Sequence, residues 1–457
     1  MRRLSACTLI CILASPAFLP VSAATTAKSG KKKSAKKPAP KRKHAAYKIR
    51  HYAPPRVSAA VRAASLEKVA IHLETPPDPA IERPGALVPF LERLYRLSNE
   101  GGPPVHILHY GDSHTAADEW TGGLRDLFQR RFGNGGAGFS FAGVPFKGYR
   151  RLDLRVGASK FWEPAGMRTG EGDGLYGLGG ISIEALRPGQ FIVLDADCDS
   201  VELDYLQQPE GGRARLSDNG IAITDLSTQG PLMPAFVEYP IAPGRHHFEL
   251  RTLDAGPVRL FGWVTHNQAG VTYESMGING AEAAVIQRWD EPMQAFYLQR
   301  RDPALIVLAY GTNEAGDSKW TESTYQETFS GVLKRLRKAA PAASILVVGP
   351  PDRLTRVKGR WRPFNAVDRI VAAQREACEA NGCAYWNLRA RMGDEGSMLS
   401  WVMAGLAQGD YVHFTAAGYQ RLAEILFQDI MRQYEKYLKV RLEVSTQLPD
   451  EPTSQDH

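Results

Sequence analysis

Five residues of this chain are of the types that together carry out acyl transfer through a serine: Ser113, Gly280, Asn313, Asp410 and His413. A serine hydroxyl is a poor nucleophile until an imidazole takes its proton, and the imidazole needs a carboxylate on its other ring nitrogen. Asp410 and His413 are three residues apart, so on one turn their side chains can face the same side. The N–H groups of Ser113 and Gly280, with the Asn313 amide, are the donors that an oxyanion requires.

Ser113, Gly280 and Asn313 each follow a predicted strand. The carboxyl ends of parallel strands meet at one edge of a sheet, which is where such sheets bind ligands. Taken alone, Ser113 is equally well explained as the ordinary N-cap of a helix in a strand–helix loop. The three strands are predicted, in the same order, at residues 105–110, 271–275 and 304–309.

Apolar strands alternate with segments of helical spacing in both flanks of the chain, which predicts an α/β fold with a parallel sheet covered on both faces. Two further strands are predicted at residues 344–348 and 383–387. Helices are predicted at residues 86–97, 119–132, 281–298, 324–340, 364–380 and 414–437.

Residues 139–267 have a different texture, with short alternating apolar runs between Gly, Pro and Asp clusters. This pattern is typical of an antiparallel β-sandwich. We therefore predict an α/β domain in two pieces, at 76–138 and 268–440, with a β-domain inserted between them and a tail at 441–457. A chain of 457 residues is long enough for two such folded units.

The first 75 residues are predicted to lie outside the folded units. Residues 1–23 have the basic start, apolar run and small-residue end of a signal peptide, which predicts export to a periplasmic or secreted location. Residues 24–75 are predicted to be a basic, disordered linker. Removing the thirteen Lys and Arg of residues 1–50 from the formal charge of +7 leaves −6 for residues 51–457. The basic segment is either a solvated linker or a peripheral contact with an anionic envelope polymer or membrane, and nucleic acid is not an expected partner.

Cysteine and histidine spacings predict no metal site and no cofactor. His246 and His247 are adjacent, so on a strand they would point to opposite faces. Cys378 and Cys383 lie five residues apart, a spacing that allows either a small disulfide loop or two free thiols.

Four segments, in order, resemble the blocks of the SGNH (GDSL-type) serine hydrolases: residues 111–114 (Gly-Asp-Ser-His), 277–280 (Gly-Ile-Asn-Gly), 311–314 (Gly-Thr-Asn-Glu), and Asp410 with His413. The resemblance implies a flavodoxin-like three-layer fold. It makes Ser113 the nucleophile, His413 the base and Asp410 its orienting acid. It also implies that Ser113, Gly280 and Asn313 form the oxyanion hole.

Two residues depart from the family pattern, because His114 replaces a leucine and Glu314 replaces an aspartate. We expect both to alter the rim of the substrate pocket. Trp401 can stack on a sugar ring as a third substrate-binding residue, or it can belong to the core.

A narrower resemblance, to the periplasmic peptidoglycan O-acetylesterases, rests on the β-insert, on residues 310–315 (Tyr-Gly-Thr-Asn-Glu-Ala), and on residues 392–398 followed by Trp401. In those relatives the insert is similar to a carbohydrate-binding jelly roll. This implies an esterase that removes O-acetyl groups from a cell-wall glycan. The alternatives are an O-acetyltransferase or a lipid or thioester hydrolase with the same triad, and a non-catalytic glycan-binding envelope protein.

Overall fold

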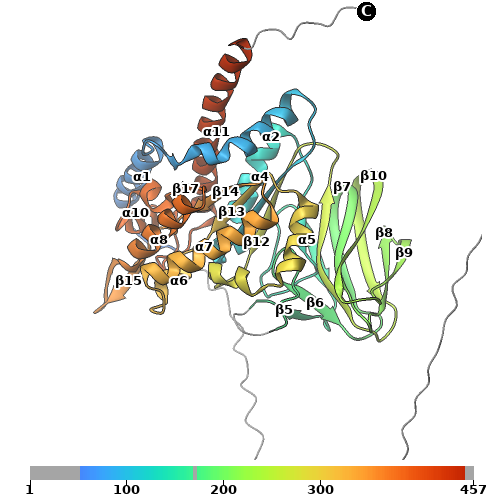
Figure 1. Cartoon of the computed structure of the whole chain (residues 1–457). Helices are drawn as coiled ribbons and strands as arrows, with labels where there is room; N and C mark the ends of the chain where they lie inside the picture. The colour runs from blue at the N-terminus through green and yellow to red at the C-terminus, as the bar shows by residue number, and fades with distance from the viewer. Residues whose placement is uncertain (1–51, 168–171, 448–457) are drawn as a thin grey trace, which may run out of the picture. The chain divides into compact units, whose positions relative to one another are not determined.

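The computed structural model describes residues 52–167 and 172–447 (Figure 1). The predicted signal peptide, the first part of the predicted linker (24–51) and residues 448–457 of the predicted tail lie outside these residues. No helix within the described residues combines the length and hydrophobicity that a membrane span requires.

A six-stranded, mainly parallel sheet forms the centre of the fold, in the order β1-β17-β14-β13-β2-β12. Five strands are parallel, and in chain order they are arranged 2-1-3-4-5, with β1 antiparallel at one edge. In this arrangement the ligand site lies at the carboxyl ends of the strands, where the strand order reverses, which is between β2 and β13. The strands are β1 (Ile81–Glu82), β2 (Val105–Gly111), β12 (Val271–Gly277), β13 (Leu305–Ala309), β14 (Ser344–Val348) and β17 (Ala384–Trp386).

Helices cover both faces of this sheet, as the apolar strands predict. Alternate residues of one strand enter different cores: Leu108 of β2 packs with one group of helices, and Ile107 packs with the other. The first group is α5 (Glu291–Arg301), α7 (Glu322–Ala339) and α8 (Ala366–Ala380). The second is α2 (Val88–Asn99), which follows the short turn η1 (Pro84–Leu87), with α4 (Glu119–Phe132) and α11 (Ala416–Gln447).

The helix predicted at 281–298 is wrong as a single element, because the segment divides at Asp290. A 3₁₀ helix, η2 (Ala283–Arg288), ends there and α5 begins. The Asp290 side chain accepts a hydrogen bond from the N–H of Met293, and Pro292 occupies the first turn of α5. A capping aspartate followed by a proline starts a new helix, since proline has no N–H to continue the preceding one.

The prediction of a disordered linker up to residue 75 is also wrong for its last part. Residues Ala59–Glu74 form helix α1, capped by the Ser58 hydroxyl. Its buried Val69 and Leu73 pack in the core cluster that also contains residues of α9 (Leu388–Met392) and α10 (Ser397–Met403). The Arg391 guanidinium donates to the backbone oxygens of the last turn of α1. The basic composition that indicates disorder ends near residue 50, and the Ala-rich stretch after it favours a helix.

A nine-stranded antiparallel sheet occupies residues 138–266, between β2 and β12 of the chain. All nine strands are hydrogen-bonded into one network, through two long strands, β7 and β10. The strands are β3 (Gly138–Phe141), β4 (Arg155–Ala158), β5 (Glu163–Ala165), β6 (Ser182–Ala185), β7 (Phe191–Gln207), β8 (Arg213–Asp218), β9 (Ile221–Ser227), β10 (Met233–Thr252) and β11 (Val258–His266).

Two of the short apolar runs of the sequence, at 190–194 and 200–206, fall within the single long strand β7. Even-numbered residues from Ile192 to Cys198 enter the core of the insert, and odd-numbered residues from Val201 to Tyr205 do so afterwards. The strand therefore changes its inward face near residue 200, where its register with β10 shifts between Pro240 and Gly244. The change of inward face interrupts the alternation of apolar and polar residues in the sequence. The single strand β7 therefore has the sequence pattern of two shorter strands.

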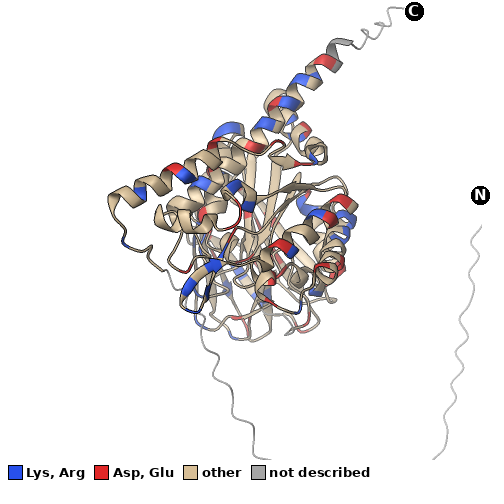
Figure 2. Ribbon diagram, turned by 90° about the vertical axis from the view of Figure 1, so that its left-hand side faces the viewer, with Lys and Arg blue, Asp and Glu red and all other residues tan. Residues whose placement is uncertain are grey.

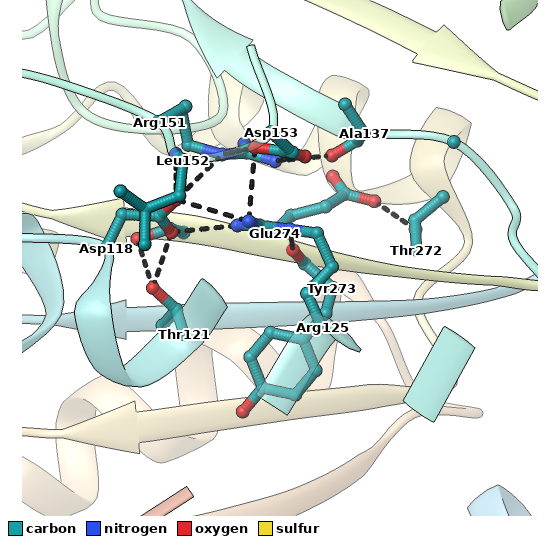
Figure 3. Close-up of polar contacts among 12 residues, drawn as sticks. Asp118, Thr121, Arg125, Ala137, Arg151, Leu152, Asp153, Thr272, Tyr273 and Glu274 are labelled. Atoms are coloured by element: carbon teal, nitrogen blue, oxygen red, sulfur yellow. Dashed lines mark hydrogen bonds and ion pairs between the residues drawn. The ribbon is translucent and has the colours of Figure 1, made fainter. Parts of the chain in front are cut away.

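A buried cluster of charges joins the insert to the central domain (Figure 3). Asp118, in the turn before α4, bonds to Arg125 at 2.8 Å, and Arg125 also contacts Asp153 at 3.1 Å. Arg151 pairs with Asp153 at 2.8 Å and donates to the backbone oxygen of Ala137 at the entrance of the insert. Each guanidinium faces carboxylate and carbonyl oxygens, so the buried charges are compensated.

Candidate active site

Ser113 lies at the abrupt turn between β2 and the short helix α3 (Ser113–Ala116). Asp112 precedes it and accepts a hydrogen bond from the N–H of His114 at 2.9 Å, which holds the turn. Gly111 is required by close packing, because a Cβ there would lie 2.1 Å from the Thr115 hydroxyl and 2.9 Å from the Ala309 carbonyl oxygen. The turn thus places the serine hydroxyl at the carboxyl end of β2.

A continuous chain of hydrogen bonds connects Ser113 with His413 and Asp410. The Ser113 Oγ lies 2.9 Å from His413 Nε2, and His413 Nδ1 lies 2.8 Å from Asp410 Oδ2. Serine, histidine and carboxylate therefore meet across 300 residues of sequence, in the order that proton removal from the serine requires.

The loop that carries Asp410 and His413 is itself rigidly held. The second carboxylate oxygen of Asp410 accepts from the N–H groups of Val412 and His413, each at 3.0 Å. Tyr411 between them has a φ of 59°, a left-handed conformation that turns both side chains to one side. Burial alone raises the pKa of Asp410, but its hydrogen bonds and attraction to His413 outweigh burial and lower it. The carboxylate is therefore charged at neutral pH.

Gly280 and Asn313 lie close to the serine turn. The Asn313 side-chain amide donates to the Ala281 carbonyl oxygen at 2.8 Å and has a long contact of 3.4 Å with Asp112. Gly280 has a φ of 76° and open space where a Cβ would point. The N–H groups of Ser113 and Gly280 donate to no acceptor within the described residues. These donors can therefore receive a developing negative charge.

Glu314 is not on the rim of a pocket, in contrast to the prediction. Its side chain is buried and accepts from the N–H groups of Ala283 and Gly311 and from the Tyr325 hydroxyl. Burial raises the pKa of Glu314 to about 7. The extra methylene compared with aspartate lets the carboxyl bridge α6 (Thr312–Gly316), which carries Asn313, and the loop after Gly280. Glu314 therefore supports these two residues from behind.

The prediction that His114 contacts substrate is contradicted by its burial. The His114 ring lies against the His413 ring, with centroids 5.1 Å apart, and its Nδ1 bonds to the Tyr419 hydroxyl at 2.9 Å. Burial is the main cause that lowers the pKa of His114 well below its ordinary value, with a smaller electrostatic contribution from the neighbouring His413. His114 is thus a neutral support under His413.

Trp401 belongs to the core, which was the alternative that its sequence left open. It is fully buried in α10, donates from Nε1 to the Met392 carbonyl oxygen and packs on Phe414. Trp361 is 36% exposed, and its ring packs on Tyr411, the residue next to Asp410.

Cys378 and Cys383, together with Cys198, are free and buried. The adjacent histidines of β10 bond to different carboxylates, His246 to Asp218 and His247 to Asp195, as their opposite directions require. Within the described residues no group of three or more His, Cys, Asp or Glu side chains is arranged to hold a metal ion.

This arrangement is the one that a serine hydrolase requires: a hydroxyl bonded to an imidazole, a carboxylate on the other ring nitrogen, and backbone N–H and amide donors close by. The model of the GDSL-like lipase/acylhydrolase family matches residues 251–421, which contain Gly280, Asn313, Asp410 and His413. The β-insert separates Ser113 from this segment in sequence, and the fold places Ser113 in contact with His413 of the segment. Residues 251–421 therefore match a domain of this family, and the chain is a hydrolase that acts on esters.

Among solved structures, the chain is similar to a peptidoglycan O-acetylesterase at 27% identity, with a TM-score of 0.66. The match covers 76% of this chain and 96% of that one, so it includes the β-insert. A family two carbohydrate esterase from Clostridium thermocellum matches at 13% identity and a TM-score of 0.26, covering 55% of this chain and 94% of that one. A family two carbohydrate esterase from Cellvibrio japonicus matches at 11% identity and a TM-score of 0.26, covering 66% of this chain and 98% of that one. No curated protein matches the chain by sequence.

Proposed function

We propose that this protein is a serine esterase that removes O-acetyl groups from a cell-wall glycan, with peptidoglycan as the substrate. The hydrogen-bonded arrangement of Ser113, His413 and Asp410 carries the proposal, because it is complete without any further group. The choice of substrate is supported by the similarity to a peptidoglycan O-acetylesterase, which extends over nearly the whole length of that protein.

In the first step, His413 Nε2 takes the proton of the Ser113 hydroxyl while the oxygen attacks the acetyl carbonyl carbon. Asp410 stabilises the imidazolium that forms. The carbonyl oxygen becomes an oxyanion, which receives hydrogen bonds from the N–H groups of Ser113 and Gly280 and from the Asn313 amide. The bond between the carbonyl carbon and the sugar oxygen then breaks, His413 protonates the sugar oxygen, and the acetyl group stays on Ser113.

In the second step, water replaces the sugar hydroxyl. His413 removes a proton from the water, the hydroxide attacks the acetyl carbon, and the same donors hold the second oxyanion. Breaking the bond to Ser113 Oγ releases acetate, and the serine recovers its proton from His413.

The rest of the proposed biology concerns location and architecture. We propose that the signal-like residues 1–23 direct export, and that the basic residues after them adhere to an anionic envelope polymer. The central domain fits a flavodoxin-like three-layer fold, and the β-insert is proposed to be a jelly-roll-like module for carbohydrate. The 2-1-3-4-5 order of the parallel strands and the shared core of the insert support this description.

Substitution of Ser113 by alanine tests the mechanism. The rate constant kcat for acetate release from O-acetylated peptidoglycan should fall on the order of 10⁶-fold, since no other group replaces the nucleophile. Ser323→Ala, at an exposed serine of α7, is the matched control and should retain activity. Urea unfolding of both variants verifies the fold. Retention of turnover by Ser113→Ala would refute the mechanism, and an active wild-type enzyme that releases acetate from small esters alone would refute the substrate.

A further inference from the structure

A two-stranded hairpin lies beside the loop that carries Asp410 and His413. It consists of β15 (Leu354–Val357) and β16 (Arg360–Pro363). Lys358 and Gly359 both have positive φ, 47° and 80°, which is the conformation of the tight turn that joins antiparallel strands. The hairpin thus has a defined geometry, and each of its side chains has a predictable direction.

The hairpin is strongly basic. Residues 353–367 contain four arginines and one lysine but neither aspartate nor glutamate, although residues 51–457 have a net charge of −6. Arg356, Lys358, Arg360 and Arg362 are all exposed, and none of them forms an ion pair with an acidic side chain of the described residues. Some exposed arginines elsewhere are paired, as Arg215 is with Asp225. The hairpin therefore presents uncompensated positive charge.

Two contacts attach the hairpin to the catalytic loop. The Leu354 N–H donates to the Tyr411 carbonyl oxygen at 3.1 Å. The rings of Trp361 and Tyr411 pack with centroids 4.1 Å apart. Tyr411 is the residue next to Asp410, so the hairpin borders the proposed site. Figure 1 shows the hairpin, labelled β15, at the left of the molecule, and Figure 2 shows that side with Lys and Arg in blue.

The strand register separates the arginines into two sets. Arg356 is paired with Trp361, and Leu354 with Pro363, so these four side chains share one face. Leu354 is buried and Trp361 contacts Tyr411, so this is the face toward the catalytic loop. Arg360 and Arg362 are paired with residues of the opposite face.

We propose that Arg356 and Trp361 form a subsite for a carboxylate-bearing unit of the glycan next to the acetylated sugar. The proposal rests on the proposed function of the triad. A guanidinium binds a carboxylate through two parallel hydrogen bonds, and a half-exposed indole offers a flat surface to a sugar ring. Peptidoglycan carries carboxylates on its peptide stems, whereas a neutral acetylated polysaccharide does not. The hairpin selects the anionic polymer.

The test compares Arg356→Ala with Arg360→Ala in the full-length protein. Both variants lose one positive charge from the same hairpin and keep the same basic N-terminal segment, so general attraction to the polymer changes equally. The ratio of kcat/KM for O-acetylated peptidoglycan to kcat/KM for 4-nitrophenyl acetate should fall about tenfold in Arg356→Ala, the lower end expected for a lost hydrogen bond to a charged group. This ratio should stay within twofold of wild type in Arg360→Ala.

A binding arm separates this proposal from the mechanism. Each substitution is combined with Ser113→Ala, and sedimentation with peptidoglycan is measured before and after its carboxylates are converted to amides. The subsite is supported if Arg356→Ala weakens binding to untreated peptidoglycan and has no effect on binding to the amidated polymer. Equal effects of the two arginine variants, or an effect that survives amidation, overturn it. If wild type releases no acetate but binding depends on Arg356 and on carboxylates, the proposed esterase function fails while the subsite stands.

Discussion

The Asn313 amide illustrates how a single residue can serve the fold and the proposed chemistry together. One hydrogen bond of its NH₂ group, to the Ala281 carbonyl oxygen at 2.8 Å, ties the Gly280 loop to α6. The other N–H is only weakly engaged, at 3.4 Å from Asp112. A donor held in place but not fully used is preorganised for an oxyanion.

Replacing Asn313 by alanine should therefore lower kcat by about 10²–10³-fold, as expected for the loss of one oxyanion donor. Asn365→Ala is a suitable control, because Asn365 is exposed at the start of α8 and makes no capping hydrogen bond with its side chain. Steady-state hydrolysis of a small ester measures both. A loss below threefold in Asn313→Ala would remove this residue from the oxyanion hole.

At the scale of elements, the turn after Ser113 is positioned from the side of the β-insert. Asp118 has a φ of 56° and receives hydrogen bonds from Thr121 and Arg125, and from the N–H of Leu152 in the insert. Burial raises the pKa of Asp118, but Arg125 and Arg151 outweigh burial and lower it, so the carboxylate is charged. The Asp118 carboxylate thus links α4 to the insert through hydrogen bonds to both (Figure 3).

Asp118→Asn keeps the shape of this side chain and removes its charge. The free energy of unfolding should fall by about 3–5 kcal/mol, because two buried guanidinium groups lose a common partner. Urea denaturation measures the change. Asp225→Asn, which breaks an exposed pair with Arg215 in the insert, should leave the unfolding midpoint nearly unchanged. Equal midpoints for both variants would show that the buried cluster does not stabilise the junction.

At the scale of the whole molecule, two buried carboxyl groups near the site contribute to the way stability depends on pH. Burial raises the pKa of Glu314 to about 7 and that of Asp112 to about 6. A raised pKa means that the folded state binds more protons than the unfolded state between the two pKa values. The contribution of these two carboxyl groups to stability is therefore lost as the pH rises from about 4.5 to about 7.

Glu314→Gln should make the free energy of unfolding less dependent on pH in this window. Its absolute stability should also decrease, because the new NH₂ group accepts no hydrogen bond and leaves either the Ala283 or the Gly311 N–H without its partner. The slope of stability against pH is accordingly the informative quantity, obtained from denaturant unfolding between pH 5 and pH 7.5. Glu322→Gln, at an exposed glutamate of α7, serves as the comparison and should keep the wild-type slope. An unchanged slope in Glu314→Gln would contradict the assignment.

Much of the fold could be predicted, because its signals are local. The apolar strands β13 and β14 and the helix α4 were expected within one residue of their observed bounds, since buried strands and amphipathic helices carry their period in the sequence. The failures have local causes as well. The cap at Asp290 starts a new helix inside a segment of continuous helical spacing. The change of inward face in β7 interrupts the alternation of apolar residues inside a single strand.

The sequence by itself determined which residue types are available and that Ser113, Gly280 and Asn313 each follow a strand. It also indicated that these residues lie close together, because parallel strands bring their carboxyl ends to one edge of a sheet. Only the tertiary structure decided what these residues touch. It buried His114 under His413, placed Glu314 behind the Asn313 turn, and set Arg356 and Trp361 on the catalytic side of the hairpin. Exposure and contact depend on segments hundreds of residues apart, and no period along the chain records them.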